Sequence, residues 1–382
     1  MSLPIRDLLV ASPVRARRPS WLTASPLIFI GCLAGAESQS QAQRETILDS
    51  VVHLESGIVA VPEVPRLDTS ATLRSHRVDI GGNIRLYVVE EGSGPALVLV
   101  NGGPGNTLHS LIPHFTRAAS FARVIYYDQR GTGLSDWVSG PSGYSTAQTV
   151  DDLERLRRVL GIHQWFVLGH SYGGLIAQWY AIRYAEHVRG LILVGSSVPV
   201  DELDLGERDY RSDAERRRIQ EVYAIDGQAV VPVHSAQVDT GTLRRMIYNG
   251  YLNGDWKRQF FFKPSRERMA QIARYEWVHD RDFNRQVRQD GFGRNLRDAF
   301  RNSPIPTLIV EGAYDANWGS DKPALFAAQH PKAELVIVER ASHFPFAEQP
   351  TTFFAQLEEF VRTAPSVDLA AVARWKRSVG RQ

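Results

Sequence analysis

The sequence contains a single cysteine, Cys32, so an internal disulfide and a zinc site built on paired cysteines are both excluded. It also lacks the zinc-binding motif His-Glu-x-x-His. The formal net charge is only +2, from 44 Lys and Arg against 42 Asp and Glu, so no basic field points to nucleic acid. We therefore expect no metal, no cofactor and no nucleic-acid partner.

Long apolar segments are equally scarce. The run at 21–33 is too short to predict a membrane-spanning helix. It follows three arginines in "RARRP" (15–19) and precedes Ala34-x-Ala36, which is the order found in a secretory signal peptide. "FIGC" also resembles a lipoprotein box, which would leave Cys32 as a lipid-bearing N-terminus. We expect a protein exported to the periplasm, secreted or lipid-anchored; the alternative is a disordered leader on a cytoplasmic protein.

What the chain does contain is ordinary for a globular protein. Its 382 residues are 43% hydrophobic and 23% charged, enough for one large domain or two smaller ones. Short apolar runs alternate with helical patterns, which predicts a mostly parallel sheet covered by helices on both faces. "SHRVDI" and "NIRLYVVE", separated by Gly81-Gly82, predict a hairpin before that sheet.

The alternation breaks between Val200 and about Asn302, where the sequence is charged and aromatic without a strand pattern. We interpret this stretch as a helical cap inserted into the sheet and covering the carboxyl ends of its strands. The predicted organisation follows: a leader and polar tether at 1–50, a core at 51–199, the cap at 200–302 and a second part of the core at 303–382.

The sequence "VLGHSYGGL" (167–175) places Ser171 among Gly169, Gly173 and Gly174. This G-x-S-x-G spacing is typical of a nucleophile elbow, in which a strained turn lifts the serine hydroxyl above the sheet edge. Glycine is needed there because side chains would collide with the neighbouring strand and helix. A glycine-rich turn with an incidental serine is the alternative.

Two partners for this serine follow later predicted strands. A serine hydroxyl needs a base to take its proton and an acid to orient that base. Asp315 comes just after "PTLIVEG", and His343 just after "AELVIVER". The order serine, acid, histidine is the order of the α/β-hydrolase triad. Asp321 and Glu311 remain alternative acids.

A tight turn, "NGGPG" (101–105), follows the predicted strand "ALVLV". Tetrahedral intermediates need hydrogen-bond donors for the oxyanion. The backbone N–H groups of Gly103 and of Tyr172, the residue after the serine, are the predicted donors. The turn is not a phosphate-binding loop, because no Gly-Lys-Ser/Thr follows it.

Together these motifs resemble the proline iminopeptidase branch of the α/β-hydrolases. That family usually reads His-Gly-Gly-Pro-Gly, Asp-Gln-Arg-Gly-x-Gly-x-Ser and Gly-x-Ser-x-Gly-Gly, and this chain has "NGGPG", "DQRGTGLS" (128–135) and "GHSYGG" (169–174). The resemblance extends over roughly residues 75–362, including "SHFPFAEQP" (342–350). Asn101 replaces the family's first histidine, and the family's frequent proline is missing after Asp315. The resemblance implies an α/β-hydrolase fold with an inserted helical cap.

The resemblance also implies that acids of the cap hold the free amine of the substrate. The candidates are Glu276, Glu202 and Asp204, with Tyr275 and Trp277 as an aromatic wall. The alternative places both aromatic residues in the core of a cap helix and turns Glu276 to solvent.

Four other residues have structural interpretations at this stage. We expect Asp128 and Arg130 to brace loops by salt bridges. We interpret His109 and His114 as ordinary loop histidines, because no third metal ligand lies near them in the sequence.

The predicted function is that of a serine hydrolase acting through an acyl-enzyme, as an aminopeptidase that releases N-terminal proline or a similar small residue. The first alternative is a carboxylesterase or lactonase acting on small esters. The second is a non-catalytic ligand-binding protein with the same fold. The expected partner is a small molecule or short peptide; the sequence does not define an oligomeric state.

Overall fold

The computed structural model of the chain describes residues 59–138, 140, 143–196, 240–280, 282–283, 286–287, 296–300, 302–315 and 321–379. The predicted leader and tether (1–50), with Cys32, lie outside the described residues. Glu202 and Asp204, in the first part of the predicted cap, lie outside them as well. The domain boundaries proposed for these segments therefore stay predictions.

Eight strands of the described chain form one sheet, in the order β1-β2-β4-β3-β5-β6-β7-β8. β1 and β2 are the predicted antiparallel hairpin, β2 pairs antiparallel with β4, and all later neighbours pair in parallel. The predicted α/β fold class is confirmed. The strands are β1 (Arg74–Asp79), β2 (Arg85–Glu91), β3 (Ala96–Val100), β4 (Arg123–Tyr127), β5 (Trp165–His170), β6 (Val188–Val194), β7 (Thr307–Gly312) and β8 (Ala333–Val338).

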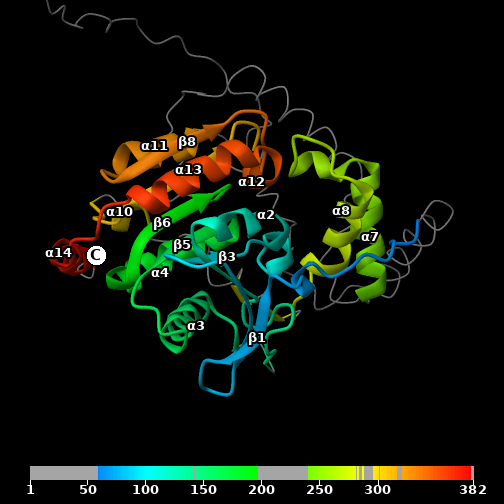
Figure 1. Ribbon diagram of the computed structural model, residues 1–382, viewed down its shortest axis with the longest axis horizontal. Coiled ribbons are helices and arrows are strands. Elements are labelled where there is room, and N and C mark those ends of the chain that lie inside the picture. Colours follow the sequence, from blue (N-terminus) through cyan, green and yellow to red (C-terminus); the bar gives the residue numbers. More distant parts are fainter. Residues whose placement is uncertain are drawn as a thin grey trace, which may run out of the picture.

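Helices cover both faces of the sheet (Figure 1), and central strands such as β5 are accordingly buried along their whole length. One face packs against α3 (Thr146–Val159), α4 (Tyr172–Arg183), α10 (Leu296–Phe300), α11 (Asp321–Gln329) and α14 (Leu369–Val379). The other packs against α2 (Ile112–Phe115), η3 (Thr116–Ser120), α12 (Pro345–Glu348) and α13 (Pro350–Thr363).

Between β6 and β7 the described residues form helices, which we call the insertion. Its elements are α7 (Thr240–Asn253), η6 (Asp255–Arg258), α8 (Arg266–Gln271) and the π-helical turn η7 (Ile272–Glu276). Figure 1 shows α7 and α8 standing apart from the sheet, on the side where α2 lies. The remaining short turns are η1 (Leu67–Thr69), η2 (Leu108–Ser110) and η5 (Ala185–His187).

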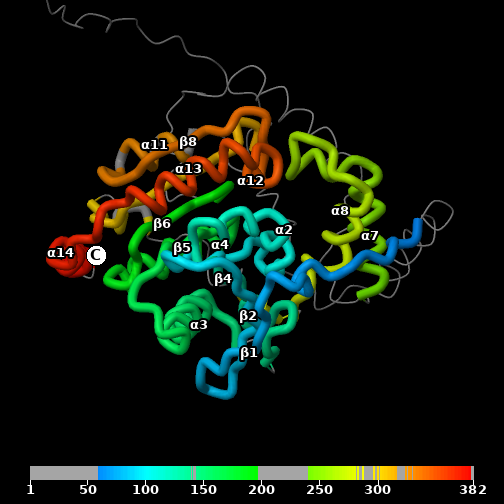
Figure 2. Tube along the Cα trace, in the orientation of Figure 1, coloured from blue at the N-terminus to red at the C-terminus, as the bar shows by residue number. Residues whose placement is uncertain are grey.

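The described chain before β1, from residue 59, extends away from the sheet to the insertion. Figure 2 shows this segment crossing from the strands to α7, where Val59 N donates a hydrogen bond of 2.9 Å to Asn249 Oδ1. The insertion is therefore held to the rest of the molecule by more than the two connections through which it leaves and re-enters the sheet.

Candidate active site

Ser171 occupies the sharp turn between β5 and α4. Its backbone has φ 54° and ψ −124°. Residues other than glycine rarely adopt this positive φ. A Cβ added at Gly169 would lie 2.3 Å from Gly173 O, and one added at Gly173 would lie 2.1 Å from Val100 O. Both glycines are thus required by close backbone approach, as the elbow prediction states.

Asp315 and His343 meet at the carboxyl ends of β7 and β8. His343 Nδ1 lies 2.7 Å from Asp315 Oδ2, and both side chains are buried. His343 also lies against the elbow, because its carbonyl oxygen is 2.8 Å from Nε2 of His170, the residue before Ser171. The structure therefore brings an acid–histidine pair to the end of the strand that carries the serine.

The two alternative acids have different positions. Glu311 is fully buried in β7, and burial, reinforced by the charge of Asp315, raises its pKa well above the usual range. Burial thus favours the neutral form of Glu311, whereas the charged form of a carboxyl group is what stabilises an imidazolium. Asp321 begins α11, and its side chain lies outside the described residues. Asp315 is the carboxylate in contact with His343.

The predicted oxyanion turn lies directly against the serine. A Cβ added at Gly102 would be 3.0 Å from Ser171 Cβ, and Gly103 has φ 116°. The turn closes through a 3.2 Å hydrogen bond from Asn106 N to Gly102 O. Tyr172 begins α4, where N–H groups point out of the helix end. Gly103 and Tyr172 thus flank Ser171 on two different elements.

Asn101, which stands where the resembled family has histidine, braces this turn through its amide. Its Nδ2 donates 3.0 Å to Asn106 O, and its carbonyl oxygen accepts a 3.0 Å hydrogen bond from Gln129 Nε2. The side-chain amide thus closes the turn, and the main-chain carbonyl group of Asn101 ties it to the loop that follows β4.

Arg130 and Asp128 stabilise that loop in two different ways. Arg130 forms the predicted salt bridge, with two contacts of 2.7 Å to Asp152. The salt-bridge prediction for Asp128 is wrong. Its carboxylate accepts hydrogen bonds from the backbone N–H groups of Leu108 at 2.9 Å and Leu134 at 2.8 Å. Burial raises the pKa of Asp128 to about 6.

Glu276, the candidate amine-binding residue of the insertion, is buried. The alternative interpretation, in which its side chain points to solvent, is therefore wrong. Glu276 is only 2% exposed, and its carboxylate lies 2.5 Å from the guanidinium of Arg268. Its carbonyl oxygen accepts a 2.9 Å hydrogen bond from Thr107 N, next to the oxyanion turn. Trp277 forms an isolated β-bridge with Asn106. Glu276 and Trp277 therefore lie beside the turn, and Glu276 already has a cationic neighbour.

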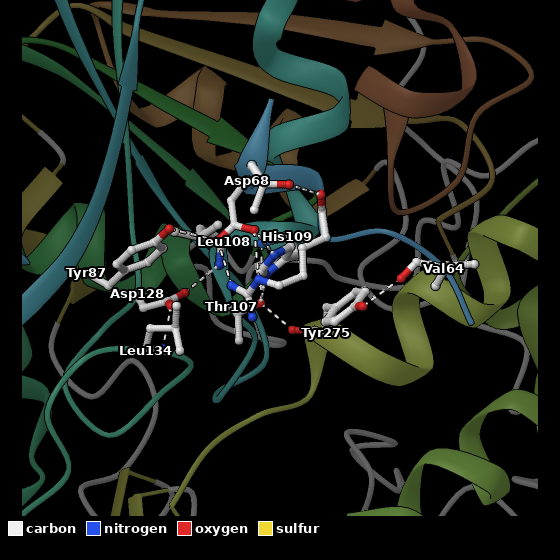
Figure 3. A network of polar contacts seen from close by, with 11 residues as sticks. Val64, Asp68, Tyr87, Thr107, Leu108, His109, Asp128, Leu134 and Tyr275 are labelled. Atoms are coloured by element: carbon white, nitrogen blue, oxygen red, sulfur yellow. Dashed lines mark hydrogen bonds and ion pairs between the residues drawn. The ribbon is translucent and has the colours of Figure 1, made fainter. Parts of the chain in front are cut away.

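The interpretation of His109 and His114 as ordinary loop histidines is wrong. His109 is buried in the short turn η2, in a polar network with Asp68 (Figure 3), and His114 is partly buried in the helix α2. Asp68 and His109 are 41 residues apart, and no local motif links them. The segments that contain Asp68 and His109 lie outside the recognised motifs, yet both contribute to the surroundings of the site.

The described residues contain no group of three or more His, Cys, Asp or Glu side chains arranged to hold a metal ion. None of the helices in the described part of the chain has both the length and the apolar composition needed to span a membrane.

Comparison with known proteins agrees with this geometry. Residues 95–350 match the alpha/beta hydrolase fold family, so the chain belongs to that family. It is similar to the proline iminopeptidase of Saccharolobus solfataricus, with 27% identity over 75% of this chain and 90% of the relative. It is also similar to the 2-(acetamidomethylene)succinate hydrolase of Mesorhizobium japonicum, with 26% identity over 75% of this chain and 95% of the relative.

Solved structures show the same fold. A crystal structure of E-2-(acetamidomethylene)succinate hydrolase matches with a TM-score of 0.56 and 22% identity, over 76% of this chain and 100% of the other. A thermophilic esterase from Thermogutta terrifontis matches with a TM-score of 0.55 and 20% identity, over 76% of this chain and 99% of the other. The predicted resemblance to proline iminopeptidases within the α/β-hydrolase superfamily is thus confirmed, and the chain is a member of a hydrolase family.

Proposed function

We propose that the protein is a serine hydrolase that transfers the acyl group of a small amide or ester first to Ser171 and then to water. The observation that carries this proposal is the 2.7 Å contact between His343 and Asp315, formed beside an elbow that holds Ser171 at φ 54°. A buried acid–histidine pair next to a strained serine is the arrangement that activates a hydroxyl group.

In the proposed reaction, His343 takes the Ser171 hydroxyl proton as the oxygen attacks the carbonyl carbon. The N–H groups of Gly103 and Tyr172 donate to the oxyanion that forms. Asp315 accepts a hydrogen bond from the Nδ1–H of His343, which fixes the ring and stabilises its cationic form. His343 then protonates the leaving group, and a water molecule activated by the same histidine releases the acid product and regenerates the serine.

Release of N-terminal proline or a similar small residue is the first specific activity that we propose. Proline iminopeptidases are among the similar proteins, and Glu276 has a buried carboxylate side chain and a backbone carbonyl group bonded to Thr107, next to the oxyanion turn. A buried ammonium group needs such a carboxylate, since an unpaired buried charge costs several kcal/mol. Trp277 would provide one wall for a proline-like ring.

Hydrolysis of small esters is the second candidate, and one observation favours it. The carboxylate of Glu276 is already paired with Arg268 at 2.5 Å, so a substrate amine would have to share it. An ester without an amine makes no such demand.

The two activities are separated by three substrates: L-proline 4-nitroanilide, its N-acetylated analogue and 4-nitrophenyl acetate. An aminopeptidase will prefer the free amine over the acetylated analogue by at least about 10²-fold in kcat/KM, because acetylation removes the charged amine that the anchoring carboxylate binds. Equal activity on the two anilides, with faster ester cleavage, identifies an esterase. Ser171→Ala must remove all of these activities, with losses approaching about 10⁶-fold.

A further inference from the structure

Residues 59–69, which precede β1, form a strap between the insertion and the core. The strap runs beside α7 and η7 and ends in the 3-10 turn η1 (Figure 2). Four of its backbone carbonyl groups and one N–H bond to insertion side chains. These hydrogen bonds are Val59 N to Asn249 Oδ1 (2.9 Å), Asn249 Nδ2 to Val59 O (3.0 Å), Arg274 Nη2 to Val61 O (2.7 Å), Arg274 Nε to Pro62 O (2.6 Å) and Tyr275 Oη to Val64 O (2.7 Å).

At the core end of the strap, Asp68 is buried among donors. Its carboxylate accepts hydrogen bonds from Arg66 at 3.1 and 2.6 Å and from the Tyr87 hydroxyl at 3.0 Å. Its Oδ1 lies 3.0 Å from His109 Nε2. Burial alone would raise the pKa of Asp68, but the hydrogen bonds and charges of His109 and Arg66 outweigh it and lower the pKa below its usual value. Asp68 is therefore ionised and can only accept hydrogen bonds.

Both ring nitrogens of His109 have polar partners. Thr107 Oγ1 gives its single proton to Tyr275 O at 2.6 Å, so it acts as acceptor toward His109 Nδ1 at 3.1 Å. On the other side of the ring, Nε2 must donate to the ionised Asp68. Figure 3 shows the imidazole held between these two partners. With both contacts made, the orientation of the His109 ring is fixed.

Through Thr107 this network reaches the oxyanion turn. Thr107 N donates to Glu276 O at 2.9 Å, and its side chain donates to the preceding carbonyl group of the insertion. Thr107 directly follows Asn106, whose N–H closes the turn onto Gly102. The backbone between Gly102 and Thr107 is thus fixed at both ends, by the elbow on one side and by His109 and the insertion on the other.

We propose that Asp68 is a positioning residue for the oxyanion turn: through His109 and Thr107, it fixes the backbone that carries the Gly103 N–H. This inference rests on the proposed serine-hydrolase function. Asp68 touches no reacting atom. Because oxyanion donors act on charge that develops in the transition state, their displacement lowers kcat and leaves KM nearly unchanged.

The test compares Asp68→Asn with Glu63→Gln in the full chain. Glu63 is a matched control, because it belongs to the same strap and its side chain is 88% exposed. We expect kcat of Asp68→Asn to fall on the order of 10–10²-fold, with KM within about threefold and the circular dichroism spectrum unchanged. Glu63→Gln should match the wild type. A change confined to KM, or no change in a folded Asp68→Asn protein, would overturn the proposal.

A double-mutant cycle checks the route through His109. If Asp68 acts through the imidazole, His109→Gln and the double variant Asp68→Asn/His109→Gln lose about as much kcat as Asp68→Asn alone. If the fold-losses in kcat of the two single variants multiply in the double variant, the two residues act independently. That result would overturn the claim that Asp68 acts through His109.

Hydrogen exchange provides a readout that needs no turnover. In Asp68→Asn, the N–H groups of Asn106 and Thr107 should exchange at least about 10-fold faster than in the wild type, and Glu63→Gln should leave them unchanged. Unchanged exchange in Asp68→Asn overturns the positioning role. Faster exchange in a protein that has no Ser171-dependent activity supports the positioning contact and rejects the proposed function instead.

Discussion

The guanidinium group of Arg268, in α8, lies 2.5 Å from the carboxylate of Glu276, the last residue of η7. The side chains are 14% and 3% exposed, so water screens this ion pair weakly. Glu276 is the described acid of the insertion that the sequence resemblance singled out for binding an amine. The role of this carboxylate therefore depends on whether a substrate amine shares it with Arg268.

Glu276→Gln separates the two candidate activities. If Glu276 binds the substrate amine, the variant should lose at least about 10²-fold in kcat/KM on L-proline 4-nitroanilide and much less on the N-acetylated analogue. If Glu276 is only a partner of Arg268, both substrates should be affected equally. The measurement is the ratio of the two kcat/KM values in wild type and variant.

Because Glu276→Gln leaves Arg268 buried without its partner, it should also destabilise the fold by about 3–5 kcal/mol. The control is the double variant Arg268→Met/Glu276→Leu, in which an apolar pair replaces the ion pair at little cost in stability. Selectivity for the free amine that survives in this folded double variant would contradict anchoring by Glu276.

Asp315→Asn should reduce kcat on the order of 10⁴-fold while leaving the fold intact. The asparagine amide presents a donor to His343 Nδ1 and so favours the wrong tautomer of the imidazole. Glu311→Gln is the matched control. Since burial raises the pKa of Glu311 and favours its neutral form, a neutral amide of the same shape should leave kcat within a few-fold. Near-normal turnover in Asp315→Asn, with loss in Glu311→Gln, would transfer the role of the acid to Glu311.

Asp128 should make stability depend on pH in the direction opposite to an ordinary salt-bridged aspartate. Its pKa is about 6 in the folded protein, and an unfolded aspartate titrates at about 4. Between these values the folded chain holds a proton that the unfolded chain has released. The contribution of this group to the free energy of unfolding therefore falls by ~3 kcal/mol as pH rises from about 4 to above 6.

Urea unfolding of wild type and Asp128→Asn at pH 4 and pH 7 measures this effect. Taking the difference in the free energy of unfolding between the two proteins removes the contributions of the other titrating groups. At the higher pH this difference should shift in favour of Asp128→Asn. An identical difference at both pH values would show that folding does not raise the pKa of Asp128.

Gly133 should not tolerate alanine. It has φ 50°, and an added Cβ would lie 2.0 Å from Asp128 Oδ2, inside the loop that follows β4. We expect Gly133→Ala to destabilise the protein by more than about 3 kcal/mol, because the clash adds to the strain of a left-handed alanine. Gly140→Ala is the control: its φ is 82°, but nothing lies within 4 Å of the added Cβ, so only about 1–2 kcal/mol should be lost. Equal midpoints of thermal unfolding in the two variants would contradict this account.

The sequence predicted the features that local patterns encode. Continuous apolar runs predicted the parallel strands, and the glycine spacing predicted the turn at Ser171. Asp315 and His343 could be paired in advance, since residues that follow neighbouring parallel strands meet at one edge of the sheet.

What the sequence could not predict depends on contacts between distant segments. Asp68 lies 41 residues before His109, and only the folded chain brings the strap under the oxyanion turn. The orientation of Glu276 was predicted wrongly in the alternative that turned it to solvent. Helical spacing alone does not reveal that Arg268, on α8, faces the same interior.

Covalent labelling of Ser171 tests the central claim most directly. The folded protein is treated with a fluorophosphonate, and the intact mass and the peptide containing residues 167–175 are measured by mass spectrometry. The account predicts one adduct per chain, located on Ser171, absent from Ser171→Ala and strongly reduced in His343→Ala, because only an activated serine reacts readily. A folded wild-type protein that acquires no adduct on Ser171 would contradict the account and favour a non-catalytic ligand-binding protein on the same fold.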